Sequence, residues 1–68
     1  MPLTAIQVAL TLKRRKQVEA QTGLARSTIY KLMADGKFPL PVKLTSKAVA
    51  WRSDEITAWI ESRIRIVG

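Results

Sequence analysis

Residues 23–36 read Gly-Leu-Ala-Arg-Ser-Thr-Ile-Tyr-Lys-Leu-Met-Ala-Asp-Gly, and this stretch decides the fold. Gly23 can make a tight bend between two helices, because a residue without a Cβ atom reaches positive φ at little cost. Ile29, Leu32 and Met33 then recur at the spacing of one helix face, and polar side chains occupy the other face. A short helix with one anchored face and one cationic face is typical of the second helix of a helix-turn-helix, which enters the DNA major groove.

Two helices are expected on either side of the Gly23 bend. The first should run from about Arg15 to Thr22, with Val18 and Ala20 facing inward. The second should cover roughly Arg26 to Ala34 and end at Asp35-Gly36, because glycine readily adopts the left-handed conformation that terminates helices.

A β-hairpin is expected to follow, because prolines 39 and 41 exclude a helix there. Inward apolar and outward residues alternate over 42–44 and 49–52, on either side of a short polar tip at 45–48. Trp51 falls on the apolar face of its strand. We therefore expect this indole to belong to the core and not to a base-stacking surface.

A last helix is expected to begin at Ser53, a residue type that serves well as an N-cap. Two acidic residues follow at positions 54 and 55, where they suit the positive end of a helix. The expected core stripe is Ile56, Trp59, Ile60 and Ile64, with Phe38 as a further core residue. The fold class predicted from these elements is α+β and mainly α: a small winged helix-turn-helix with one β-hairpin wing and a C-terminal helix.

Residues 1–12 form an apolar segment ahead of the winged helix-turn-helix domain expected over residues 13–68. Large apolar residues alternate from Ile6 to Leu12, which favours a strand. A helix through Leu3, Ile6 and Leu10 is the alternative. A strand without a partner in its own chain would invite pairing with another subunit, so this segment is also a candidate for self-association.

The composition excludes several classes of site. The chain has 68 residues, which is enough for one domain, and it contains no cysteine and no histidine. Disulfides, zinc fingers and Ser-His-Asp centres are therefore excluded, and we expect no metal, no cofactor and no enzymatic activity. The longest uncharged run, residues 1–12, is shorter than the roughly 20 residues of a membrane span. The absence of cysteine fits a reducing cytoplasm. We therefore expect a cytoplasmic protein, and one that binds DNA would be associated with the nucleoid.

Positive charge is concentrated in the middle of the chain. Residues 13–52 hold ten Lys or Arg and two acidic residues, a net charge of +8, whereas residues 53–68 carry −1. Nucleic acid is the polyanion expected to bind such a region, with an anionic membrane as the weaker rival.

Three groups of residues are candidates for DNA contact. On the second helix, arginine can bridge two acceptors of a guanine edge, serine offers a short donor or acceptor, and the residues further along are suited to phosphates. The tip of the hairpin could lie across the backbone or enter a minor groove. The basic run at residues 13–16 could contact phosphates or be merely solvated. The candidates are Arg26, Ser27, Thr28, Tyr30 and Lys31 on the helix, Lys43, Thr45, Ser46 and Lys47 on the hairpin, and Arg14 and Lys16 in the basic run.

Blocks of sequence along most of the chain resemble the AlpA family, small regulators of phages and genomic islands whose fold is similar to MerR winged helices and phage excisionases. The resemblance covers about residues 12 to 64. The blocks are Val18, Thr22-Gly23-Leu24, Arg26-Ser27-Thr28-Ile29-Tyr30, Gly36, Phe38-Pro39, Pro41-Val42-Lys43-Leu44, Val49, Trp51, Glu55 and Trp59.

The resemblance implies a protein that binds double-stranded DNA of a mobile element. It would regulate transcription, often of a neighbouring integrase gene, or bend DNA beside attachment sites to favour excision. A homo-oligomer on DNA and an integrase are further partners that this role suggests. The rival hypothesis is an interaction module in which residues 1–12 bind an integrase or a second copy and DNA binding is secondary.

Three departures from the family pattern stand out. Ala25 occupies a place where serine usually caps the recognition helix, a loss worth about 1 kcal/mol. Arg15 and Glu19 occupy places that tend to be apolar in relatives. Thr45-Ser46 replaces a wing tip that contains glycine.

Overall fold

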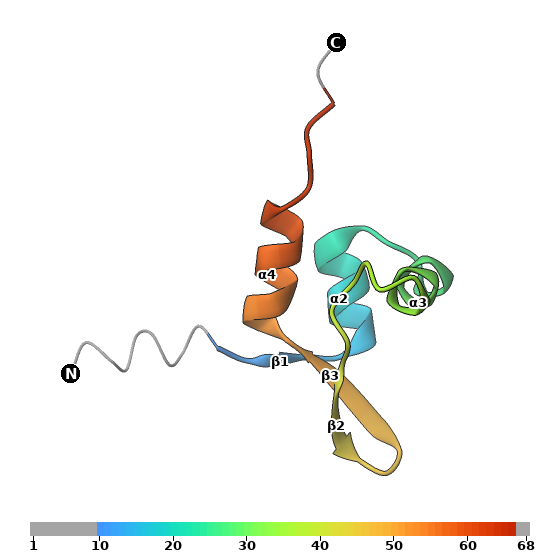
Figure 1. Cartoon of the computed structure of the whole chain (residues 1–68). Helices are drawn as coiled ribbons and strands as arrows, with labels where there is room; N and C mark the ends of the chain where they lie inside the picture. The colour runs from blue at the N-terminus through green and yellow to red at the C-terminus, as the bar shows by residue number, and fades with distance from the viewer. Residues whose placement is uncertain (1–9, 67–68) are drawn as a thin grey trace, which may run out of the picture.

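The structure is a computed structural model that describes residues 10–66, so most of the strand expected before Leu12 lies outside the described residues. Three helices and a three-stranded antiparallel sheet of order β1-β3-β2 make up the fold, a small winged helix-turn-helix (Figure 1). The elements in chain order are β1 (Leu12–Lys13), α2 (Arg15–Thr22), α3 (Arg26–Ala34), β2 (Val42–Thr45), β3 (Ala48–Arg52) and α4 (Ser53–Glu61).

The bend between α2 and α3 forms as the sequence predicts. Gly23 has φ +78° and donates its backbone N–H to Glu19 O at 2.8 Å, which ends α2. Asp35 is the C-cap of α3, and Gly36 follows it with φ +72° and donates its N–H to Met33 O at 3.0 Å. An L side chain would strain the backbone at both positions, because residues with a Cβ atom rarely adopt this conformation. The two predicted helix ranges are confirmed residue for residue.

One small core connects every helix to the sheet. It consists of the buried side chains Val18 from α2, Ile29 from α3, Phe38 from the following loop, Trp51 from β3 and Ile56 from α4. Because each helix contributes a single fully buried residue, a shift of any one helix would open the core. Leu32, Met33, Trp59 and Ile60 pack against its edge as the apolar spacing predicts.

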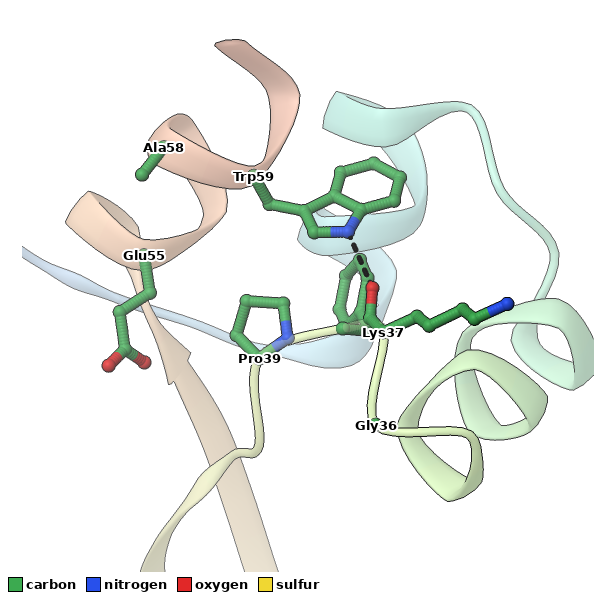
Figure 2. Close-up of a pocket in the computed structure, with 7 residues that line it drawn as sticks. Gly36, Lys37, Pro39, Glu55, Ala58 and Trp59 are labelled. Carbon is green, nitrogen blue, oxygen red and sulfur yellow. Dashed lines mark hydrogen bonds between the residues drawn. The ribbon is translucent and has the colours of Figure 1, made fainter. Parts of the chain in front are cut away.

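Both indoles also hold the loop between α3 and the hairpin. Trp51 Nε1 donates to Pro39 O at 3.0 Å, and Trp59 Nε1 donates to Lys37 O at 2.8 Å (Figure 2). The Phe38 ring packs edge-on against Trp59, with the ring centroids 4.9 Å apart. The C-terminal end of α3 is thereby fixed to β3 on one side and to α4 on the other.

The first strand of the hairpin corrects one prediction. Its apolar residues were expected to face inward, yet Val42 is 37% and Leu44 42% exposed, and every residue of β2 is exposed. The physical reason is that α2 and α4 pack on β3, while β2 is an edge strand beyond them. Figure 1 shows the hairpin projecting away from the helices.

Two other inward assignments are also wrong. Ala20 is exposed on the outer face of α2. Ile64 is 93% exposed, because α4 ends at Glu61 and the chain then leaves the core.

Ser53 has a different role from the N-cap that the sequence suggests. It is the first residue of α4, Arg52 occupies the N-cap position, and the Ser53 hydroxyl accepts a hydrogen bond from Thr11 N at 2.8 Å. The Ser53 backbone N–H donates in return to Thr11 O at 2.8 Å. β1 is thus paired with β3 and tied to α4 within its own chain.

The start of α4 is stabilised instead by acidic side chains. Asp54 Oδ1 accepts the N–H of Glu55 at 2.9 Å, and its carboxylate receives two hydrogen bonds from Arg52 at 2.9 and 3.0 Å. These hydrogen bonds hold the pKa of Asp54 below its usual value.

Replacing Ser53 with alanine should lower the free energy of unfolding by about 1 kcal/mol, because the Thr11 N–H loses its acceptor at a partly buried position. Thermal unfolding followed by circular dichroism should show a fall in Tm of about 4–8 °C. Ser46→Ala at the exposed hairpin tip is the matched control and should change stability by less than about 0.5 kcal/mol. Equal Tm values for the two variants would contradict a tethering role for Ser53.

Candidate nucleic-acid interface

All of the side chains predicted to contact DNA are exposed. They come from three parts of the fold: the residues around the start of α2, the outer face of α3 and the hairpin formed by β2 and β3. The exposed candidates are Arg14, Lys16, Arg26, Ser27, Thr28, Tyr30, Lys31, Lys43, Thr45, Ser46 and Lys47.

Helix α3 presents its polar face because its apolar face is fully used by the core. Ile29 is completely buried, and Leu32 and Met33 pack against the same cluster. On the outer face the Arg26 guanidinium lies 5.6 Å from the centre of the Tyr30 ring, one turn further along. A cation–π contact of this kind restrains the arginine along the helix surface while leaving its donors available.

The starts of α2 and α3 share an unusual electrostatic character. Neither helix has an acidic residue in its first turn, whereas α4 has two. Ala25 offers no side-chain cap to α3, and at the start of α2 the capping group is the neutral Gln17, whose Oε1 accepts the Arg14 N–H at 2.8 Å. The missing cap at Ala25 agrees with the departure seen in the sequence. Helix N-termini carry partial positive charge, so both ends add to the field of the neighbouring cations.

The tip of the hairpin is ordered by a hydroxyl group in place of glycine. Lys47 donates its backbone N–H to Thr45 Oγ1 at 3.1 Å, and the pairing register shifts between Lys43 and Thr45. The Thr45 oxygen therefore serves the turn itself. Lys43 lies on β2 and Lys47 lies in the turn just before β3, and both residues are exposed.

A surface hollow of about 410 Å³ brings the three parts together. It is lined by Arg14, Arg15 and Lys16 from the start of α2, Tyr30 from α3, and Lys47 and Val49 from the hairpin. Four of the predicted residues therefore surround one site. Arg15 and Val49 also line the hollow but were not among the predicted contact residues. The i,i+4 spacing of Arg15 and Glu19 does signal, from sequence alone, the ion pair that they form.

The cations of this surface lack acidic partners. Within residues 10–66 the ion pairs are Arg15–Glu19 and Arg52–Asp54, and no candidate residue takes part in either. A second hollow of about 480 Å³ lies apart from the candidates, between α4 and the loop after α3 (Figure 2). Its lining is Gly36, Lys37, Phe38, Pro39, Glu55, Ala58 and Trp59.

Other kinds of site find little support in the described part of the chain. Residues 10–66 contain no group of three or more His, Cys, Asp or Glu side chains placed to hold a metal ion. None of the described helices combines the length and the apolar character that crossing a membrane requires.

Comparison with known proteins agrees with the resemblance seen in the sequence. The family model for the prophage CP4-57 regulatory protein (AlpA) matches residues 11–64. A protein of Enterobacteria phage P4, designated "Uncharacterized protein ORF88", is 47% identical over 64 residues, which cover 94% of this chain and 72% of the phage protein. The family match runs from the residue before β1 to just beyond α4, and so includes the core, both helices of the helix-turn-helix and the hairpin. The chain belongs to the AlpA family of phage regulatory proteins.

Proposed function

We propose that this protein is a sequence-specific duplex-DNA-binding regulator of a mobile genetic element, acting on nucleoid DNA in the cytoplasm. The observation that carries the proposal is the set of exposed cations without acidic partners and of exposed hydroxyl groups on α3, the start of α2 and the hairpin, three parts that meet at one hollow. Membership of a phage regulatory family supports the same role.

The position of each residue on the fold determines which part of the DNA it is proposed to contact. The first turn of α3 enters the major groove, where Arg26 contacts a guanine edge and Ser27 and Thr28 contact neighbouring bases or the backbone. Tyr30 and Lys31 lie further along the helix and contact phosphates. The hairpin residues Lys43, Thr45, Ser46 and Lys47 rest on the adjacent backbone, where they position the protein and add little sequence preference.

Two regulatory jobs fit these contacts. A transcription factor would protect a promoter and change polymerase occupancy, whereas an excisionase would bind several phased sites beside an attachment site and bend the DNA. Footprinting on the DNA that flanks the gene, combined with a gel-based bending assay, separates the two. Complete absence of a footprint, together with equal affinity for duplex DNA and heparin at physiological ionic strength, would contradict DNA binding itself.

An interaction module is the second candidate function, and the N-terminal residues favour it. Leu10 and Leu12 are half-exposed and line a hollow of about 340 Å³ with Thr11 and Arg52. In this role residues 1–12 bind an integrase or a second copy of the chain. Deleting residues 2–9 would then change the oligomeric state while leaving the affinity of a single copy for DNA unchanged.

Arg26→Ala should weaken binding to the target by about 1–3 kcal/mol, roughly 5- to 150-fold, and relax the preference at one base position. Selection of binding sites from a randomised duplex library measures both effects. Arg65→Ala, a change of the same type in the exposed C-terminal tail, is the control and should leave the base preference intact. An equal loss for Arg26→Ala on random DNA would make Arg26 a backbone contact.

Lys47→Ala should weaken binding by a similar factor on every sequence, because a phosphate contact carries no base information. The slope of log Kd against log salt concentration should fall by about one unit, as expected when one fewer counterion is released. Lys37→Ala removes a lysine that lines the second hollow and should leave the slope unchanged. A slope equal to the wild-type value would show that Lys47 is only solvated.

A further inference from the structure

The start of α2 carries charge of the sign that a helix N-terminus disfavours. Four consecutive cations occupy residues 13–16, α2 begins at Arg15, and its first turn contains no acidic residue. Only Arg15 is neutralised, by Glu19 one turn further on. Cations at the positive end of a helix repel both the helix dipole and one another. The fold therefore tolerates a local electrostatic cost at this point.

The same end of α2 forms one wall of the hollow described above. Tyr30 of α3 and Lys47 of the hairpin form further walls, and Val49 adds an apolar surface. The Tyr30 ring contacts Arg26, and its hydroxyl group makes no hydrogen bond to any other residue within 10–66. A phenol donor, two lysines and an arginine beside the positive end of a helix are groups that bind phosphate oxygens.

We propose that this hollow is a single binding site for one backbone phosphate of duplex DNA, held jointly by Arg14, Lys16, Tyr30 and Lys47. The inference rests on the proposed function and deepens it. Tyr30 donates its hydroxyl hydrogen to the phosphate, and the cations neutralise its charge. Arg15 stays with Glu19 and lines the site without carrying an unpaired charge.

A shared phosphate would do more than add affinity. It links α2, α3 and the hairpin through one atom group on the DNA, so it fixes how far α3 enters the major groove when the hairpin rests on the backbone. Because Arg26 stacks on Tyr30, the register of the base contact depends on the same site. Phosphate contacts are known to set register and orientation in this way.

The test replaces each backbone phosphate of the bound duplex, one at a time, with a neutral methylphosphonate. Wild-type protein should lose about 5-fold or more in affinity at one position per bound copy, or at two adjacent positions. On unmodified duplex, Lys16→Gln, Tyr30→Phe and Lys47→Gln should each weaken binding about 3- to 10-fold. All three should then lose less affinity than the wild-type protein when that same position is neutralised, and should keep their wild-type sensitivity elsewhere.

Lys31→Gln is the matched control, because Lys31 is an exposed cation of α3 that does not line the hollow. It should weaken binding and retain the wild-type response at the shared position. If the wild-type protein binds duplex DNA but each of the three variants loses sensitivity at a different, separated phosphate, the shared site is overturned. The proposed function remains intact in that case. A wild-type protein that does not bind duplex DNA would overturn both.

Thermal unfolding of the same variants distinguishes the site from a structural role. Lys16→Gln removes a cation from the positive end of α2, so its Tm at low salt should rise by about 2–5 °C even though its DNA affinity falls. The gain should disappear at high salt, where the charges are screened. A lower Tm for Lys16→Gln would show that Lys16 supports the fold, and would contradict an anion site at this helix start.

Discussion

The candidate nucleic-acid interface depends on one constraint: two indole N–H groups donate hydrogen bonds to the chain between α3 and the hairpin. Trp51 and Trp59 bind the carbonyls of Pro39 and Lys37, two residues apart, with Phe38 buried between them. In a domain of this size each core residue carries a large share of the stability, because little surface is buried on folding. The chain therefore uses its bulkiest side chains twice, as apolar volume and as donors that fix the end of α3.

The local elements could be read from the sequence because local rules determine them. Glycine at positions 23 and 36 and the apolar spacing of Ile29 with its neighbours were enough to place both helices. The sequence could not show which residues far apart in the chain contact each other, or which strand the helices leave uncovered. Val42 and Leu44 alternate like buried strand residues, yet no helix reaches the edge strand that carries them. Ser53 resembles an N-cap, but its hydroxyl is taken by Thr11, 42 residues away.

In the candidate site, too, the local features could be predicted from the sequence and the tertiary arrangement could not. Every predicted contact residue is exposed, since polar residues on an amphipathic helix or at a hairpin tip are outward by default. That the basic run, Tyr30 and Lys47 surround one hollow follows only from how α2 packs on β3 beside α3. The departures from the family pattern also gain a local explanation. Arg15 and Glu19 form an ion pair across one helical turn, where the family pattern has apolar residues. Thr45 accepts a hydrogen bond that orders the hairpin tip, where the family pattern has a glycine.

The three helices differ in whether their first turn contains acidic residues. The two helices proposed to lie against DNA, α2 and α3, have none there, and α4 has two. Helix α4 has Asp54 and Glu55 in its first turn, and the Asp54 carboxylate accepts a backbone N–H. Helices α2 and α3 have no acid in the first turn, and α2 is capped only by the neutral Gln17, whose Oε1 accepts the Arg14 N–H at 2.8 Å. Capping groups and a bound phosphate compete for the same N–H groups and the same partial charge. The absence of an acidic residue from the first turns of α2 and α3 weakens these helices in the free protein and keeps their positive ends available to an anion. The stability lost locally and the attraction for DNA therefore have a common physical origin.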